Sequence, residues 1–165
     1  MAKYTAWRRK LKFKQFDAEL CSTMSFAVVG SAEKFTPSHH AYRVYRLLRE
    51  LGVEVYPVVA DTVKLGKDKV YPSLIDLPHQ VTTAIPCLPS NFALSIVQDC
   101  HAAGIPNIWF QPHTLSAEAA EFCHTYDLKI IDGCTLKYFE FNDVTRFFHP
   151  CYWHAKTIRR KQLKL

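Results

Sequence analysis

The stretch that decides the fold runs from Ser25 to Ser31 and reads SFAVVGS. This short apolar run ends on a glycine, and it is followed by a helical pattern and by a second apolar run, VEVYPVV, at residues 53–59. A buried strand that turns through a glycine into a helix places backbone N–H groups and a helix N-terminus at one edge of a sheet, where they attract anions. The pattern therefore predicts a parallel α/β sheet and the edge at which a ligand binds.

The rest of the chain continues this alternation of strands and helices. We expect a Rossmann-like, parallel five-stranded sheet with helices on both faces and with the strands in the order 3-2-1-4-5. A proline cannot donate a ladder hydrogen bond, so Pro86 indicates either an edge strand or a strand that ends there, and in this order the third strand is an edge. The expected strands are 25–30, 54–59, 82–88, 107–111 and 129–132, and the expected helices are 38–51, 90–103 and 116–126.

The 165 residues suit one domain, and a hydrophobic content of 48% is enough for a core. We expect an α/β domain over residues 1–141, which includes an extra N-terminal amphipathic helix over residues 5–21. Residues 142–165 form an extension whose aromatic side chains would pack on the domain or on a second copy in a homodimer. No apolar run reaches the roughly 18 residues of a membrane span, and the basic N-terminus lacks a secretory signal, so we expect a cytoplasmic protein.

The net charge of +6 is unevenly distributed along the chain. Residues 1–15 hold six basic residues and residues 151–165 hold five, and neither segment contains an acidic residue. The remaining residues carry ten basic side chains against all fifteen acidic ones, which makes the body mildly acidic. Two basic ends of this kind are typical either of solvated surface segments or of segments that dock to an anionic partner.

The six cysteines are spread along the chain and none forms a CxxC pair. We interpret them as reduced thiols, with Cys100 and Cys123 as small buried hydrophobes inside helices. The expected strand order places Cys87 and Cys134 four strand spacings apart, about 19 Å, which is too far for a disulfide. The spacing of His149, Cys151 and His154 matches no standard zinc site, and we expect no metal.

Polar residues at the expected carboxyl ends of the strands are the candidates for ligand contacts, because open α/β sheets bind ligands there. Ser31 and Lys34 follow the first strand and offer a hydroxyl and an ammonium to a phosphate. The loop lacks the GxGxxG pattern of dinucleotide binders, and the chain contains no Walker loop and no GxSxG nucleophile motif. The residues therefore favour a phosphate-bearing ligand more than any particular reaction.

The order of several motifs resembles the single-domain CoA-binding proteins of bacteria and archaea, which are similar to the CoA-binding domain of the succinyl-CoA synthetase α-subunit. The resemblance covers about residues 10–141. Its most specific parts are the segment YPSLIDLP with the preceding Gly66, the W-x-Q that ends at Gln111, the helix start S-x-E-A-A at Ser116, and Cys134.

The resemblance implies that the first loop and the ends of the second and third strands hold the nucleotide and phosphates of CoA. The first loop would contribute Gly30, Ser31, Ala32 and Lys34, and the next two strand ends would contribute Val59, Ala60, Leu88 and Ser90. Gln111, His113 and Cys134 would line the far end of the site, within reach of a pantetheine thiol.

The chain departs from the family pattern at three of these places. Residues 57–60 read PVVA where the family usually has PVNP, and residues 87–90 read CLPS where arginine and polar residues are common. Pro112 and His113 stand where a glycine often follows the W-x-Q. An absent arginine removes a bidentate phosphate contact, so the ligand contacts differ more from the family than the fold does.

Three hypotheses on function follow from these observations. The first is non-enzymatic binding of CoA, an acyl-CoA or a related adenine nucleotide. The second is an interaction protein with a vestigial pocket, whose basic ends dock to an anionic partner. The third is a thiol-based enzyme or sensor in which His113 lowers the thiol pKa of Cys134.

Overall fold

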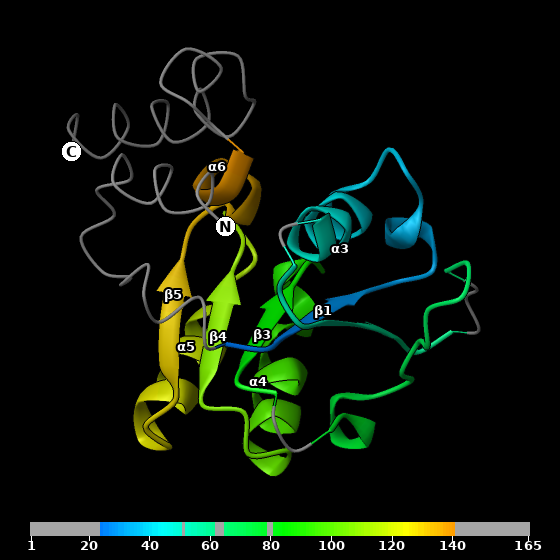
Figure 1. Cartoon of the computed structure of the whole chain (residues 1–165). Helices are drawn as coiled ribbons and strands as arrows, with labels where there is room; N and C mark the ends of the chain where they lie inside the picture. The colour runs from blue at the N-terminus through cyan, green and yellow to red at the C-terminus, as the bar shows by residue number, and fades with distance from the viewer. Residues whose placement is uncertain (1–23, 51, 62–64, 79–80, 141–165) are drawn as a thin grey trace, which may run out of the picture.

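The computed structural model describes residues 24–50, 52–61, 65–78 and 81–140, and its five strands form one parallel sheet (Figure 1). The strands are β1 (Phe26–Gly30), β2 (Val55–Val59), β3 (Thr83–Pro86), β4 (Asn107–Phe110) and β5 (Lys129–Asp132). The α-helices are α3 (His40–Glu50), α4 (Ala93–Ala102), α5 (Ala117–Thr125) and α6 (Thr135–Glu140), and the short 3-10 turns are η1 (Glu33–Phe35), η2 (Leu74–Asp76) and η3 (Ser90–Phe92). The predicted Rossmann-like α/β class is confirmed.

The predicted strand order is wrong, because the sheet runs β2-β1-β3-β4-β5. β3 lies between β1 and β4 and is not an edge strand. The chain therefore crosses from β2 past β1 before it forms β3. One consequence is that β3 and β5 are only two strand spacings apart, about 10 Å, although this still exceeds the Cα separation of a disulfide.

Pro86 is accommodated in an interior strand because of its place in the ladder. The backbone N–H groups of Thr83 and Cys87 donate to β1, at Ser25 O (3.1 Å) and Val29 O (2.8 Å), so the nitrogen of the alternate residue Pro86 faces β4. The pairing between β3 and β4 ends at Ala84, before a donor would be needed at Pro86. The proline is thus compatible with an interior strand and coincides with the point where β3 and β4 stop pairing.

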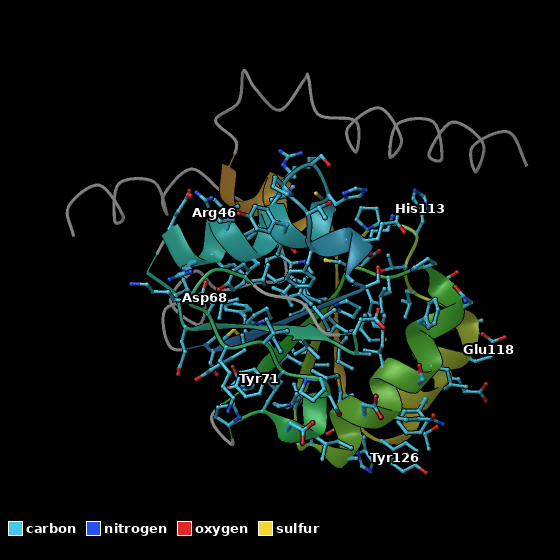
Figure 2. The ribbon with its side chains drawn as sticks, turned by 90° about the vertical axis from the view of Figure 1, so that its right-hand side faces the viewer. Arg46, Asp68, Tyr71, His113, Glu118 and Tyr126 are labelled. Atoms are coloured by element: carbon cyan, nitrogen blue, oxygen red, sulfur yellow. The ribbon has the colours of Figure 1, made fainter. Side chains whose placement is uncertain are left out.

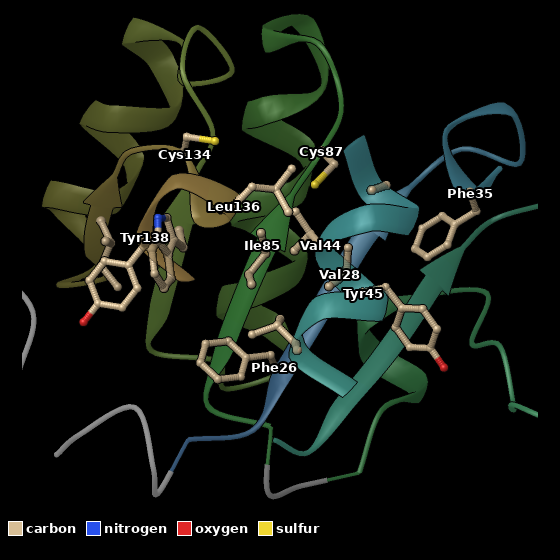
Figure 3. Close-up of a cluster of buried hydrophobic side chains, with 14 of the residues drawn as sticks. Phe26, Val28, Phe35, Val44, Tyr45, Ile85, Cys87, Cys134, Leu136 and Tyr138 are labelled. Atoms are coloured by element: carbon tan, nitrogen blue, oxygen red, sulfur yellow. The ribbon is translucent and has the colours of Figure 1, made fainter. Parts of the chain in front are cut away.

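Both faces of the sheet are buried, and alternate residues of β1 serve the two faces. Phe26 and Val28 pack with α3 and α6, whereas Ala27 and Val29 pack with α4 and α5. This alternation follows from the period of two in a strand, and strands buried on both sides are continuously apolar. Figure 3 shows the first of these clusters, in which Ile85 of β3 and Leu136 of α6 also take part.

α6 was not predicted from the sequence. Its Leu136 and Tyr138 are buried on the α3 face of the sheet, and the Tyr138 ring meets the Trp109 ring edge-on at 5.2 Å. The Trp109 indole N–H donates to the carbonyl oxygen of Gly133 at 3.0 Å, which fastens the turn that leads into this helix. The helix is only six residues long, and tertiary packing therefore stabilises it more than its own sequence pattern does.

The YPSLIDLP segment anchors the connection from β2 to β3. Tyr71 pairs with the outer edge of β2, because its N–H donates to Pro57 O (3.0 Å) and its carbonyl accepts from Val59 N–H (2.9 Å). Ser73 caps η2 by accepting a hydrogen bond from Ile75 N–H, and Leu74 is buried on the face covered by α4. This motif therefore has a structural function in the fold.

Several expectations lie outside the described residues. They are the helix over 5–21, the extension over 142–165 with its basic end, the basic first fifteen residues and the His149, Cys151 and His154 cluster. The homodimer and the cytoplasmic location also stay predictions. Among the helices that are described, none has the length and apolar character required to cross a bilayer.

Gly30 ends β1 where the chain comes closest to η1 and α3. A Cβ at this position would lie 2.8 Å from the Phe35 ring and 3.1 Å from the Cβ of Ala41. Phe35 and Ala41 are both buried, so neither group can move freely. Glycine is thus required at the end of β1 by close packing.

We predict that Gly30→Ala lowers the free energy of unfolding by about 1–3 kcal/mol, because the added methyl overpacks this contact. Urea denaturation followed by circular dichroism measures the change. In the double variant Gly30→Ala/Phe35→Leu the smaller side chain should relieve the clash, so the two effects should be less than additive. Strict additivity would contradict the explanation.

Candidate ligand-binding site

A hollow of about 590 Å³ opens at the carboxyl ends of β1, β3 and β4. It lies beside the junction between β1 and β3, which is where the strand order reverses in a sheet of order 2-1-3-4-5. Sheets of this type bind ligands at that switch point. The lining residues are Lys34, Ser38, His39, His40, Cys87, Leu88, Pro89, Gln111, Pro112, His113 and Thr114.

Three segments bring these residues together. Lys34 lies in η1 after the Gly30 turn, and His40 begins α3. Leu88 follows Pro86, at the end of β3 where pairing with β4 has stopped. Gln111 directly follows β4, and its carbonyl accepts hydrogen bonds from the N–H (3.1 Å) and the hydroxyl (2.8 Å) of Thr114.

Gln111 is buried and joins three segments beneath the hollow. The backbone N–H of Thr135 donates to its Oε1 at 3.0 Å, and this fixed donor determines which way the amide points. The amide nitrogen then donates to Thr135 Oγ1 at 2.6 Å, and Oε1 also meets His40 Nε2 at 2.8 Å. The single side chain thus connects α3, the end of β4 and the start of α6.

His40 is held as a neutral imidazole by its surroundings. Burial lowers its pKa from the ordinary value of 6.5, the hydrogen bond with Gln111 partly opposes this shift, and the positive charge of Arg43 adds to it. Because Gln111 Oε1 can only accept, His40 Nε2 carries the proton and donates it. His40 therefore contributes a dipole and a hydrogen bond at the base of the hollow, and no charge at neutral pH.

His113 lies at the rim with a backbone φ of +66°. Non-glycine residues are uncommon in this left-handed region, although histidine, asparagine and aspartate are found there more often than others. In the family that this chain resembles, a glycine often follows the W-x-Q at this place. The turn therefore keeps a conformation that suits glycine while it presents an imidazole beside the hollow.

The structure places four of the predicted site residues in the lining of the hollow: Lys34, Leu88, Gln111 and His113. The other predicted site residues do not line it: Gly30, Ser31, Ala32, Val59, Ala60, Ser90 and Cys134. Gly30 packs against Phe35, and Ser31 Oγ accepts weakly from the N–H of Lys34 at 3.4 Å. Of the predicted residues that line the hollow, Gln111 uses its side-chain amide for hydrogen bonds to Thr135.

The two thiols at this edge have different positions. Cys87 lines the hollow and is almost fully buried, and that burial raises its thiol pKa well above the ordinary value. Cys134 is buried in the core cluster with Leu136 and Tyr138 and does not line the hollow. Cys100 and Cys123 are fully buried in α4 and α5, which confirms their predicted role as buried hydrophobes.

The predicted site residues did not include four residues that line the hollow: Ser38, His39, His40 and Thr114. A signal for the two histidines was present, since the first turn of the helix after a glycine turn faces the ligand edge of such sheets. Among the described residues, no group of three His, Cys, Asp or Glu side chains is arranged to hold a metal ion.

A second hollow of about 810 Å³ lies between α3 and residues 65–68. Figure 2 places its Arg46 and Asp68 far from His113. Its two arginines pair with carboxylates, Arg46 with Glu50 at 2.6 Å and Arg49 with Asp68, and Lys67 also lines it. Because both arginines are already paired and two carboxylates line this hollow, it is less suited to an anionic ligand than the one at the strand ends.

The five-stranded parallel sheet of order 2-1-3-4-5, with a hollow at its switch point, defines the class of doubly wound α/β domains. Within that class, the chain belongs to the CoA binding domain family, whose model matches residues 24–140. The match includes every strand and helix described above.

Two relatives match part of this chain. It is 30% identical over 95 residues to the α subunit of acetate–CoA ligase (ADP-forming) I of Pyrococcus furiosus, and 29% identical over 83 residues to acetate–CoA ligase (ADP-forming) II of Archaeoglobus fulgidus. These matches cover 52% and 49% of this chain. They span only 20% and 12% of the lengths of the two relatives.

Solved structures with the same fold include a conserved hypothetical protein of Pyrococcus furiosus, with a TM-score of 0.61 and 27% identity over 66% of this chain and 92% of that one. An acetyl-coenzyme A synthetase of Ca. Korarchaeum cryptofilum gives a TM-score of 0.57 and 26% identity, over 68% of this chain and 26% of the synthetase. The fold thus occurs both as most of a small protein and as one part of a longer enzyme.

We predict that Gln111→Met lowers the free energy of unfolding by about 3 kcal/mol, because it leaves buried groups of Thr135 and His40 without their partner. Chemical denaturation measures the loss. Gln98→Met, on the exposed face of α4, is the matched control and should change stability by less than about 0.5 kcal/mol. Equal effects of the two substitutions would show that the junction at Gln111 contributes little.

The lowered pKa of His40 predicts a pH dependence of stability. Below pH 6.5 the unfolded chain binds a proton at His40 that the folded chain resists, so the free energy of unfolding should fall as the pH is lowered through this range. Denaturation of the wild type and of His40→Gln between pH 7.5 and pH 5 measures the effect. The variant should lose less stability than the wild type, whereas His124→Gln, at an exposed position in α5, should behave like the wild type.

Proposed function

We propose that this protein binds CoA, an acyl-CoA or a related adenine nucleotide in the hollow at the carboxyl ends of β1, β3 and β4, and that it binds without carrying out a reaction. The observation that supports this most directly is the position of the hollow. It lies at the switch point of the sheet, and the CoA binding domain model matches residues 24–140, which contain all five strands.

The charges around the hollow suit a phosphate-bearing ligand. Among the described residues, the ionisable side chains that line it are Lys34, three histidines and the thiol of Cys87, and none is a carboxylate. Lys34 is half-buried, which strengthens its interaction with an anion relative to a fully solvated lysine. The first turn of α3 borders the same space, so the positive end of its helix dipole adds to the attraction.

The apolar part of the lining suits the uncharged arm of CoA. Leu88 and Pro89 after β3 and Pro112 after β4 contribute carbon surface to the hollow. A pantetheine arm presents amides and methylene groups, which such a surface can accommodate. We therefore place the phosphates near Lys34 and the arm between the ends of β3 and β4.

The predicted residues outside the hollow extend the proposed site along the sheet edge. Ala60 is exposed directly after β2, next to the loop that contains Ser31 and Ala32, and Ser90 is half-buried at the start of η3. Val59 is buried, so it can offer only its backbone. In this proposal the ends of β2 and β3 flank the adenine and ribose.

Binding without a reaction is supported by the state of Cys87, the one thiol among the described residues that line the hollow. The thiolate is the reactive form of cysteine, and the raised pKa of Cys87 disfavours it. The ligase activity in the names of the two relatives belongs to proteins of which this chain matches a fifth or less.

The test is native mass spectrometry of the full chain as purified, followed by calorimetric titration with CoA, acetyl-CoA and NAD. We expect an adduct of CoA mass or micromolar binding of CoA, with weaker binding of NAD. If no nucleotide produces heat or an adduct, the proposal fails. Salt-dependent binding to a polyanion through residues 1–15 and 151–165 would then favour the interaction protein.

We predict that Lys34→Ala weakens CoA binding about tenfold, because it removes one charge-assisted contact with a phosphate. Titration calorimetry at low salt measures the change. Lys129→Ala is the matched control, since this exposed lysine begins β5 at the opposite end of the strands. Unchanged affinity in Lys34→Ala would remove Lys34 from the site.

A further inference from the structure

Three rings form an aromatic cluster at the C-terminal ends of α4 and α5. His101 lies in the last turn of α4, Phe122 lies in α5, and Tyr126 directly follows α5. The ring centroid of Tyr126 is 4.5 Å from that of His101 and 4.4 Å from that of Phe122. Tyr126 is 48% exposed and His101 is also exposed, while Phe122 is half-buried against the core. The aromatic cluster therefore offers supported ring surface on the outside of the domain.

The charge around the aromatic cluster is negative and uncompensated. No lysine or arginine occurs between Lys69 and Lys129, whereas the same stretch contains five acidic residues. Three of these, Asp99, Glu121 and Asp127, are exposed and lie one or two positions from a ring of the cluster. None of the three forms an ion pair with another described residue. Such a surface suits a partner that is basic and also carries apolar side chains.

The aromatic cluster and the hollow lie at opposite edges of the sheet. A helix that follows a strand in a parallel sheet runs back along it, so α4 and α5 end beside the starts of β4 and β5. Figure 2 accordingly shows Tyr126 far from His113. A segment bound at the cluster would therefore leave the hollow open, and the two binding events can be tested separately.

We propose that the basic first fifteen residues of this chain dock on the aromatic cluster of the same copy. Residues 1–15 contain six lysines and arginines, three aromatic residues and no acidic residue. The basic side chains can pair with the three carboxylates, and the aromatic side chains can pack on the exposed rings. A guanidinium over the Tyr126 ring would add a cation–π contact.

The point at which the described chain begins favours this segment over the basic residues 151–165. Met24 precedes β1 at the same edge of the sheet as the aromatic cluster. Residues 16–23 can extend over about 26 Å, whereas β1 and β4 are only two strand spacings apart, about 10 Å. Residues 151–165 follow α6, which packs with α3 on the other face of the sheet. The first fifteen residues thus have the more direct route to the cluster.

Zero-length carbodiimide cross-linking of the full chain at low salt tests this docking, because it joins a lysine to a carboxylate only where the two are in contact. We expect links from the lysines of residues 1–15 to Asp99, Glu121 or Asp127. Asp61, an exposed carboxylate that follows β2, is the matched control and should give a much lower yield. A mixture of isotope-labelled and unlabelled protein shows whether each link lies within one copy. Added salt should lower the yield of these links, since it screens exposed charges.

A substitution in the aromatic cluster provides a second measurement. Tyr126→Ser removes ring surface and should weaken docking about tenfold, so the yield of the expected links should fall several-fold. Phe92→Ser is the matched control, because Phe92 is 46% exposed and lies at the opposite end of α4. This control should leave the yield unchanged.

Each outcome decides the proposal. Links within one copy that are lost in Tyr126→Ser and kept in Phe92→Ser support it. Links between copies would assign the surface to a second copy, links from residues 151–165 would assign it to the other basic end, and either result overturns the proposal. An absence of links, or an equal yield in wild type and Tyr126→Ser, also overturns it.

Discussion

The ligand edge of this protein depends on the hydrogen bonds of the buried Gln111 side-chain amide. Gln111 follows β4 directly, and its hydrogen bonds reach Thr135 at the start of α6 and His40 at the start of α3. Each of these groups would be an unpaired polar atom without it, and such atoms are costly in a protein interior. The hollow is therefore built above a polar junction that fixes the relative positions of two helices and one strand end.

Pro86 also shapes this edge, because proline has no backbone N–H to donate to a neighbouring strand. Its nitrogen faces β4 but carries no hydrogen, and the β3–β4 ladder has already ended at Ala84. The pairing of β3 with β1 continues to Pro86. The ends of β3 and β4 are thus free of mutual hydrogen bonds, and the hollow lies between the residues that follow them.

The electrostatic character of the hollow follows from these positions. Lys34 supplies a charge from η1, while burial keeps His40 neutral and lowers the reactivity of Cys87. Among the described lining residues, the edge thus combines the half-buried cation of Lys34 with hydrogen-bond donors and apolar walls. Such an arrangement is suited to an anion with an uncharged arm, as the proposed function requires.

The elements themselves were largely predictable from local pattern. β5 matches its expected bounds, β1 and β2 begin one residue later than expected, and Ser116 caps α5 as expected, with its Oγ accepting from Ala119 N–H at 3.2 Å. Strands buried on both faces are apolar throughout, and caps are local features, so a single sequence contains both signals. Residues 135–140 carry no comparable signal, because α6 is stabilised by packing against the core.

The sequence by itself determined the α/β class, the family resemblance and the edge at which a ligand would bind, since strands, glycine turns and caps are set by neighbouring residues. Only the tertiary structure decided that β3 lies inside the sheet, that Gln111 is a structural junction, and that Cys134 is buried in the core while His113 borders the hollow. The physical reason is that strand order and side-chain burial depend on contacts between segments distant in the chain. A proline read in isolation cannot show which neighbouring strand its missing N–H would have faced.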